Sequence, residues 1–558
     1  MSSSSYKVFG QPISRTRKEN QQDAGTLNLE GETPSAKANR LKELGNQQFG
    51  SRHYEKAAEL FSQAIDVLKA LDDGDQHKAK ALAVLYNNYS ACMEFREQLE
   101  DAMKFASMAV ELNPDYVKPY VRRSRVYKQK KKLKECVWDL GTIVRLLNTD
   151  STVFKFEGEG EKFLTEIIVV AKDIVNEHSM KLMEDRIKRE IFLPISQTNV
   201  AEWTTLTVIH DPLLIRMHEL GKEAPTDPLD LALFHLKNHE YLKVLPLARP
   251  TFGKRFLGRL LAARIYFYAG LREQFMFLYQ MLNEMWYNSP EDFKAGNAEL
   301  LVTLMILKMY VESPNIVEVQ LLQNIELWEG NGDAFVVLSI IYHRLLQFEL
   351  SFKALEYAKQ VEPNRPHLKY HETATKFASA THNQDINSVH QITSAIDYLI
   401  RNDPNPPLHG VLLAARIFAV SQNSKLALEL LEKHKNRDDG RDVGIQLLHT
   451  VVKHDSKGAN TQTADFRRDV EELLAKDPHN FETLRLLFRC CIESGEFELA
   501  FEHAKAAWLN TRTLEEFSSV YHDLILAASL AGTEIPIEEY PPFEGPEYPR
   551  ANSKETAK

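Results

Sequence analysis

Between residues 38 and 147, the chain repeats one order of small, apolar and polar positions. Each copy has a small residue, an apolar helix, a turn, and a second helix with another small residue twelve positions later. Small residues are needed where two helices pack closely, because a larger side chain would push them apart. The three pairs are Gly45 and Ala57, Ser90 and Ala102, and Ser124 and Cys136.

The spacing of these copies identifies the repeat. From Ala102 to Cys136 is 136 − 102 = 34 residues, which is the period of the tetratricopeptide repeat. From Ala57 to Ala102 is 45 residues, one period plus eleven, and the polar segment 71–78 supplies the insertion. Pro114 is expected to stop the second repeat. The pattern therefore predicts three stacked helical hairpins.

Five polar residues fall at matching positions of these hairpins. Lys42 and Asn46 are four apart on one predicted helix, and Lys118 and Arg122 have the same spacing on another. Asn88 precedes Arg122 by one period, since 122 − 88 = 34. Stacked hairpins would align all five side chains along one concave wall.

The wall offers hydrogen-bond donors suited to carboxylates and peptide groups. Lysine and arginine offer charge-assisted hydrogen bonds, and asparagine adds amide donors without adding charge. Any one of these residues alone is more typical of a solvated surface. Five at matching repeat positions favour a groove that binds a chain terminus flanked by Asp or Glu.

The segments that carry these residues closely resemble the dicarboxylate-clamp tetratricopeptide domains of co-chaperones. The segments are 41–46 (LKELGN), 86–91 (YNNYSA) and 117–122 (VKPYVR). In that family, the matching Lys, Asn, Asn, Lys and Arg hold the Glu-Glu-Val-Asp tail of the 70- and 90-kDa heat-shock chaperones. The resemblance implies that Lys42, Lys118 and Arg122 pair with carboxylates, while Asn46 and Asn88 hold the terminal carboxylate or the peptide backbone.

The remainder of the chain is predicted to be helical as well. Residues 163–187 have apolar side chains at helical spacing and predict one long helix. The segment 260–266 (LLAARIY) is echoed by 412–418 (LLAARIF). Two further tetratricopeptide-like units are indicated, one by Ser339, Tyr342, Ser351, Ala358 and Pro363, the other by Ala500, Ala504 and Ala507. This half is expected to be a degenerate solenoid with a second binding surface.

A looser resemblance concerns the junction between the two parts. The segments 111–114 (ELNP), 134–136 (KEC) and 189–194 (REIFLP), followed by Trp203, resemble the family of the 70-kDa receptor of the mitochondrial outer-membrane translocase. In that family a clamp domain precedes a longer helical-repeat domain for client precursors. The resemblance implies the same architecture here.

In the second part, a stripe of Met276, Phe277, Met281 and Met285 has two interpretations. Methionine side chains are adaptable and could line a groove for apolar client segments. At helical spacing, such a stripe is more often ordinary core.

Composition narrows the function classes. A net charge of −10 and a pI near 6.1 argue against general nucleic-acid binding. The four cysteines have neither metal-ligand spacing nor the pattern of a disulfide framework, which fits a reducing compartment. We expect no membrane-spanning or secretory segment, because no apolar run is long enough. A cytoplasmic protein is expected, with the mitochondrial surface as an alternative.

Catalytic patterns are lacking. His235 and His239 are four apart, but Leu236 occupies the place of a catalytic Glu. The sequence 210–212 (HDP) has the wrong order for the His-Pro-Asp tripeptide of J-domains. We therefore expect no enzyme, no cofactor and no metal site.

The expected organisation is an all-α, tetratricopeptide-type α-solenoid in two parts. Residues 1–36 are predicted to be a disordered tail, 37–150 the clamp of three repeats, 151–205 a connecting helix and linker, 206–534 the degenerate solenoid, and 535–558 a Pro-rich tail. The predicted function is that of a non-enzymatic co-chaperone that docks the tail of heat-shock protein 90, heat-shock protein 70 or both, and binds an unidentified client. The alternatives are a mitochondrial precursor import receptor or its soluble relative, and a scaffold that binds an internal acidic segment.

Overall fold

The computed structural model contains α-helices, one short 3-10 helix, and no strand among the residues it describes. The described residues are 33–71, 76–147, 159–201, 203, 209–248, 256–323, 325–365, 368–435, 442–455 and 464–536. The predicted all-α fold is therefore confirmed. The predicted tails lie outside the described residues, except for 33–36 and 535–536.

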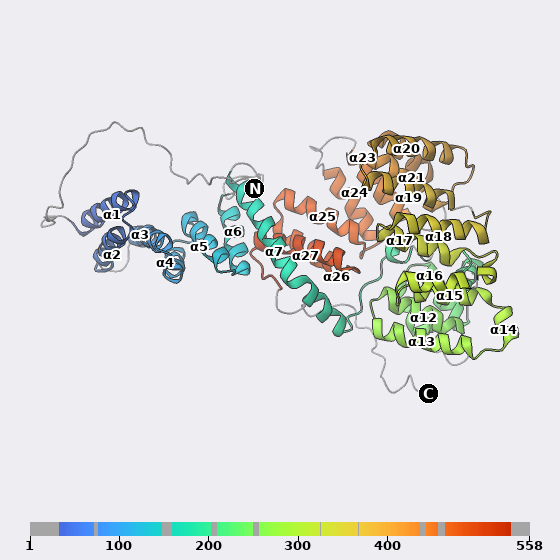
Figure 1. The fold of residues 1–558 in the computed structure, drawn as a ribbon. Helices are drawn as coiled ribbons and strands as arrows, with labels where there is room; N and C mark the ends of the chain where they lie inside the picture. The colour runs from blue at the N-terminus through green and yellow to red at the C-terminus, as the bar shows by residue number, and fades with distance from the viewer. Residues whose placement is uncertain are drawn as a thin grey trace. The chain divides into compact units, whose positions relative to one another are not determined.

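The chain divides into two compact units, which end and begin at Lys130 and Lys131. We call the part up to Lys130 unit 1 and the part from Lys131 unit 2. The expected boundary near residue 150 stays a prediction, and the division between the units falls after the first helix of the third predicted repeat. Figure 1 labels helices of both units where there is room.

The described residues of unit 1 form five helices. They are α1 (Pro34–Gly50), α2 (Tyr54–Lys69), α3 (Gln76–Phe95), α4 (Leu99–Leu112) and α5 (Val117–Gln129). Helices α1 and α2 pack as one antiparallel hairpin, and α3 and α4 pack as the next. Thr33 caps α1 by accepting a hydrogen bond from the Ala36 amide at 3.3 Å, and Pro34 occupies the first turn. Helix α4 ends at Leu112, before Pro114, as the sequence predicts.

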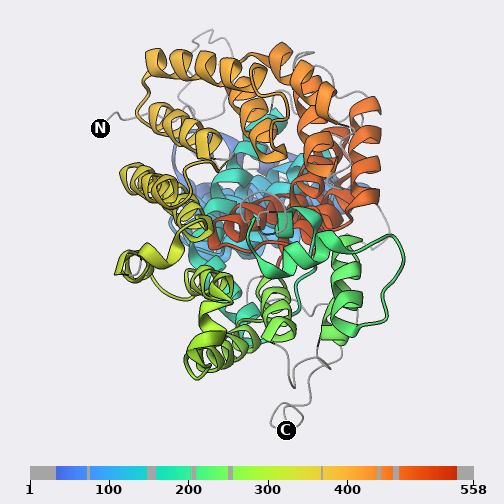
Figure 2. The same ribbon diagram turned by 90° about the vertical axis from the view of Figure 1, so that its right-hand side faces the viewer.

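Unit 2 begins with α6 (Leu133–Leu147) and the long α7 (Glu159–Lys188), which confirms the helix predicted at 163–187. The short helices that follow are α8 (Gln197–Ala201), α9 (Pro212–Glu219), α10 (Pro228–Lys237) and α11 (Tyr241–Ala248). The first half of the solenoid comprises α12 (Phe256–Tyr268), α13 (Arg272–Tyr287), α14 (Glu291–Ala295), α15 (Ala298–Lys308), α16 (Pro314–Gln323), η3 (Ile325–Trp328), α17 (Asp333–Arg344) and α18 (Phe348–Val361). The second half comprises α19 (Leu368–His382), α20 (Ile386–Arg401), α21 (Leu408–Val420), α22 (Ser424–His434), α23 (Asp442–Asp455), α24 (Ala464–Lys476), α25 (Phe481–Ser494), α26 (Phe497–Leu509) and α27 (Leu514–Ala531). Figure 2 shows these helices following one another along an arc, from green through yellow to orange.

Ser90 and Ala102 in unit 1, and Ser339 and Ser351 in unit 2, lie where the two helices of a hairpin touch. The Ser90 hydroxyl donates to the Ala102 carbonyl at 2.6 Å, twelve residues away. In unit 2 the Ser351 hydroxyl donates to the Ser339 carbonyl at 2.9 Å, again twelve residues away. All four residues are buried. The same close contact therefore recurs in both units.

A second recurring feature is the turn between the helices of a hairpin. Leu346, Gln384 and Gln422 have positive φ angles of 58°, 57° and 59°. They are evenly spaced, since 384 − 346 = 38 and 422 − 384 = 38. The residue after each one donates its amide to the carbonyl five positions earlier, at 2.8 to 2.9 Å, which is the Schellman arrangement of a helix end.

This period of 38 residues explains the echo seen in the sequence. The segments 260–266 and 412–418 lie in α12 and α21, and 412 − 260 = 152, which is four periods of 38. The degenerate repeats of unit 2 are thus helical hairpins with a slightly longer period than the 34 residues of the first part.

The C-terminal helix α27 packs against α6 and α7, at the start of unit 2. The Arg145 guanidinium donates to the carbonyls of Ser529 at 2.5 Å and Leu530 at 3.2 Å. A Cβ atom at Gly141 would lie 2.1 Å from the Ser529 carbonyl oxygen, so only glycine fits there. The predicted connecting helix is therefore packed between the first and last helices of unit 2.

Candidate functional site

The five residues of the predicted clamp lie on α1, α3 and α5 of unit 1. Lys42 and Asn46 are one turn apart on α1, Asn88 lies in the second half of α3, and Lys118 and Arg122 lie on α5. Lys42 donates to the Asn39 side chain at 3.0 Å, within its own helix. The Asn88 side-chain amide donates to the Asn46 oxygen at 3.2 Å, across 42 residues of sequence. The structure thus brings the two predicted asparagines together.

Arg122 is anchored to α3. Its Nε donates to the Asn87 oxygen at 3.5 Å, and its Nη1 donates to the carboxylate of Glu94. Asn87 also donates to the Tyr116 hydroxyl at 3.4 Å. Burial lowers the pKa of Arg122, while the charge of Glu94 raises it. Arg122 is therefore held by neighbouring side chains, with 15% of its side chain exposed.

Lys118 differs from Arg122. Its side chain is exposed and has no hydrogen-bond or ion-pair partner among the described residues. Among those residues, no hydrogen bond joins Lys118 or Lys42 to Asn46 or Asn88. The alignment of all five side chains as one clamp stays a prediction.

Sequence reasoning missed Asn87, Glu94 and Arg125 at this site. Glu94 lies on the Asn87 face of α3, two turns further on, and Arg125 lies one turn after Arg122 on α5. Glu94 accepts two hydrogen bonds from Arg125, both at 3.1 Å. The heptad spacing of Asn87 and Glu94 was a usable signal. Nothing in the sequence revealed that their partner is Arg122.

In unit 2, the segment 210–212 (HDP), whose order differs from the His-Pro-Asp tripeptide of J-domains, has a structural role. Asp211 caps α9 by accepting the Leu213 amide at 2.8 Å. Its other oxygen accepts from Arg264 at 2.9 Å and from the Trp203 indole at 3.0 Å. Arg264 lies over the Trp203 ring, 4.9 Å from its centre, and both charged side chains are almost fully buried. Asp211 and Arg264 form a buried ion pair that fixes the start of α9.

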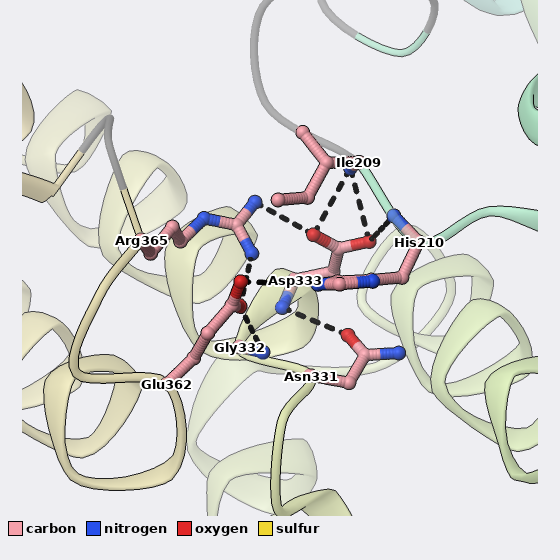
Figure 3. Close-up of polar contacts among 7 residues, drawn as sticks. All are labelled: Ile209, His210, Asn331, Gly332, Asp333, Glu362 and Arg365. Atoms are coloured by element: carbon pink, nitrogen blue, oxygen red, sulfur yellow. Dashed lines mark hydrogen bonds and ion pairs between the residues drawn. The ribbon is translucent and has the colours of Figure 1, made fainter.

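A second buried network surrounds the N-terminus of α17 (Figure 3). The Asp333 carboxylate accepts the backbone amides of Ile209 and His210, the latter at 2.8 Å. It also accepts from Arg365 at 2.6 Å. Anions are favoured at this end of a helix, where backbone N–H groups point outward. Asp333 therefore ties the segment before α9 to a helix more than 120 residues later.

Glu362 completes this network (Figure 3). Its carboxylate accepts from Arg365 at 2.8 Å, from the Gly332 amide at 2.8 Å, and lies 3.1 Å from the His210 ring nitrogen. Burial would raise the pKa of Glu362, but these hydrogen bonds lower it to about 2. The hydrogen bond to Glu362 in turn raises the pKa of His210. Glu362 therefore joins the segment before α9, the start of α17 and the turn after α18.

The candidate histidines and the methionine stripe of the sequence both lie in unit 2. His235 pairs with Glu240, and His239 lies 3.0 Å from the Tyr241 hydroxyl. No cluster of metal-ligand type exists in the part of the chain that the structure describes. Met276, Met281 and Met285 pack partly buried against the core of unit 2, whereas Phe277 is 47% exposed.

None of the described helices combines the length and apolar character needed to cross a membrane. The four cysteines are buried.

Comparisons with known proteins place this chain beside import receptors and chaperone cofactors. No family model matches it. It is 29% identical over 107 residues to the mitochondrial import receptor subunit TOM70 of Rattus norvegicus, a match that covers 19% of this chain and 17% of the relative. It is 34% identical over 98 residues to the DnaJ homolog subfamily C member 7 of Mus musculus, covering 18% of each chain. A match to the mitochondrial import receptor subunit TOM34 of Pongo abelii is 30% identical over 118 residues and covers 21% of this chain and 37% of the relative.

Among solved structures, yeast Tom70 matches with a TM-score of 0.45 and 15% identity, over 90% of this chain and 97% of that one. The curated relatives are matched over only 17 to 37% of their own length. They confirm the resemblance to clamp-type co-chaperones and to the import receptor family that the sequence predicts.

Proposed function

We propose that this protein is a non-enzymatic adaptor whose unit 1 groove binds the acidic C-terminal tail of heat-shock protein 90 or 70. The observation that carries the proposal is the joining of α1, α3 and α5 through three of the predicted clamp residues together with Asn87. Asn46 meets Asn88, and Arg122 is fixed beside Asn87. Lys118 stays exposed and available to a ligand.

The mechanism is tethering. Lys42, Lys118 and Arg122 pair with the carboxylates of the tail, and the two asparagine amides hold the terminal carboxylate or the peptide backbone. Affinity is expected to be micromolar, because ordering a flexible peptide offsets much of the interaction energy. Affinity should also fall with salt, because the pairs are near solvent.

Unit 2 supplies the second partner surface in this proposal. A solenoid of helical hairpins exposes an extended face to a client. A cytoplasmic location, with docking at the mitochondrial surface as the alternative, follows from the same proposal. The similarity to the mitochondrial import receptor subunits TOM70 and TOM34 favours a mitochondrial precursor import receptor as the second candidate function.

The test is calorimetric titration of the full chain with a peptide that ends in Met-Glu-Glu-Val-Asp. We expect micromolar binding by the free acid and a large loss with the amidated peptide. Lys118→Ala should weaken binding about tenfold or more, since a charge-assisted hydrogen bond contributes roughly 1.5–3 kcal/mol. Lys118 gives the clearest mutational test of the clamp, because its side chain makes no hydrogen bond or ion pair with the described residues that the substitution would break.

Lys56→Ala is the matched control, because Lys56 is an exposed lysine on α2, outside the groove-forming helices. It should bind like the unmodified protein. Equal binding of free acid and amide would favour the scaffold that recognises an internal acidic segment. No binding of the free acid would refute the clamp, and binding of precursor proteins together with outer-membrane fractionation would then support the import receptor.

A further inference from the structure

The groove contains a carboxylate of its own. Glu94 lies one residue before the end of α3, and only 13% of its side chain is exposed. It accepts one hydrogen bond from Arg122 and two from Arg125, the latter through Nε and Nη2. Glu94 thus occupies the position toward Arg122 that an acidic ligand would otherwise take.

This contact limits what Arg122 offers to a ligand. Its Nε is used by Asn87 and its Nη1 by Glu94, which leaves Nη2 without an acceptor among the described residues. A free guanidinium can grip a carboxylate with two parallel hydrogen bonds. Arg122 in this setting keeps one nitrogen fully open, so a ligand carboxylate must share the guanidinium with Glu94.

The charge balance leads to the same conclusion. Arg122, Arg125 and Glu94 together carry a net charge of +1 instead of the +2 of the two arginines. The Arg125 side chain is 52% exposed, so its charge is partly solvated, whereas Glu94 and Arg122 are largely buried. Glu94 therefore cancels positive charge at the position where the predicted ligand carboxylate would bind.

We propose that Glu94 competes with the ligand for Arg122 and thereby sets the affinity and specificity of the clamp. The inference rests on the proposed function of the groove. It predicts that tails placing one carboxylate near Arg122 are accepted, while a second negative charge at the same place adds little affinity. The partner selected is a tail whose acidic groups are held mainly by Lys42 and Lys118.

The size of the effect follows from Coulomb's law. Two carboxylates on opposite sides of one guanidinium are roughly 6–7 Å apart, and a site between protein surface and water has an effective dielectric constant of about 40–80. Removing the charge of Glu94 should then tighten binding about three- to tenfold.

The experiment compares the full chain with its Glu94→Gln variant in titrations with the Met-Glu-Glu-Val-Asp peptide. Glutamine keeps the size of the side chain and an oxygen that accepts from Arg122, so the groove keeps its shape. We expect about three- to tenfold tighter binding and a steeper loss of affinity with salt, because one more positive charge faces the ligand. Unchanged or weaker binding would overturn the inference.

Two further variants separate competition from general electrostatics. Glu97→Gln makes the same change of charge on an exposed residue three positions later, which has no contact with Arg122, and it should shift affinity less than Glu94→Gln. Glu94→Gln/Arg125→Gln restores the original net charge but still lacks the competing carboxylate, so it should bind more tightly than the unmodified protein. An equal effect of Glu97→Gln, or a double variant whose affinity returns to that of the unmodified protein, would contradict the proposal.

A change in folding is monitored by circular dichroism of each variant. If Glu94→Gln unfolds unit 1, Glu94→Asp is the fallback variant. Aspartate keeps the charge, but its side chain is one methylene shorter and its carboxylate lies further from Arg122, so tighter peptide binding is again expected.

Failure of the two proposals can be told apart. Absence of binding in both the unmodified protein and Glu94→Gln refutes the clamp together with this inference, whereas binding that does not depend on Glu94 refutes the inference alone.

Discussion

The buried ion pair of Asp211 and Arg264 offers the sharpest test of how unit 2 is stabilised. Asp211→Asn keeps a side-chain oxygen at the N-cap of α9 but removes the negative charge. Arg264, of which 1% is exposed, then stays buried without a counter-charge. Breaking a buried pair by changing one partner costs about 3–5 kcal/mol, because the remaining charge stays desolvated.

The lower end of that range is expected here. Asparagine is as good an N-cap as aspartate, so the hydrogen bond from the Leu213 amide is kept. The face of the Trp203 ring also continues to attract the guanidinium, which a cation over an aromatic ring does in a desolvated site. We therefore predict a loss of about 3 kcal/mol in the free energy of unfolding of unit 2.

The assay is urea unfolding of the full chain followed by tryptophan fluorescence. All five tryptophans lie after Lys131, so this signal reports on unit 2 alone. Asp227→Asn is the matched control, because Asp227 caps α10 in the same way but its side chain is 29% exposed. The control should lose only a few tenths of a kcal/mol, as expected for a conservative exchange at an N-cap.

A rescue variant completes the design. Asp211→Asn/Arg264→Met removes the stranded charge and should recover most of the lost stability, since buried pairs can often be replaced by apolar residues at little cost. A loss no larger than that of Asp227→Asn, or no rescue by Arg264→Met, would refute the reasoning. Peptide binding by unit 1 should be unchanged in Asp211→Asn, because the pair lies wholly in unit 2.

Three further predictions concern the packing, the turns and the pH dependence of unit 2. Gly141→Ala should lower its urea midpoint clearly, because the added Cβ would collide with the Ser529 carbonyl at 2.1 Å. Leu346→Gly should raise stability by about 0.5–1 kcal/mol, because glycine adopts the positive φ of 58° without strain and only part of that gain is lost to chain entropy. The pKa of Glu362 is lowered to about 2 in the folded protein, so this group stabilises the fold above the unfolded pKa near 4.5, and the stabilisation is lost as pH falls toward 2. The pKa of His210 is raised in the folded protein, so this group stabilises the fold below the unfolded pKa near 6.5, and the stabilisation is lost as pH rises further. The urea midpoint should therefore peak between about pH 4.5 and 6.5, and Glu362→Gln should flatten that peak.

The local features of the fold could be derived from the sequence. Small residues twelve apart, as in Ser90 and Ala102, gave the hairpins, because the contact between two adjacent helices depends on a short stretch of chain. The stop at Pro114 and the long helix after the clamp were also predicted, since both follow from local backbone preferences. The candidate asparagines on α1 and α3 were predicted to share a wall, and Asn46 and Asn88 do meet.

The repeat and its helices could therefore be predicted from the sequence, because a periodic pattern is written into neighbouring positions. Only the tertiary structure decided that α27 returns to α6, that Asp211 pairs with Arg264, and that Glu94 occupies Arg122. These contacts join residues between 28 and almost 400 positions apart, and their geometry depends on how successive hairpins are rotated against each other. Small rotations per hairpin add up along a solenoid, and no spacing along the chain records their sum.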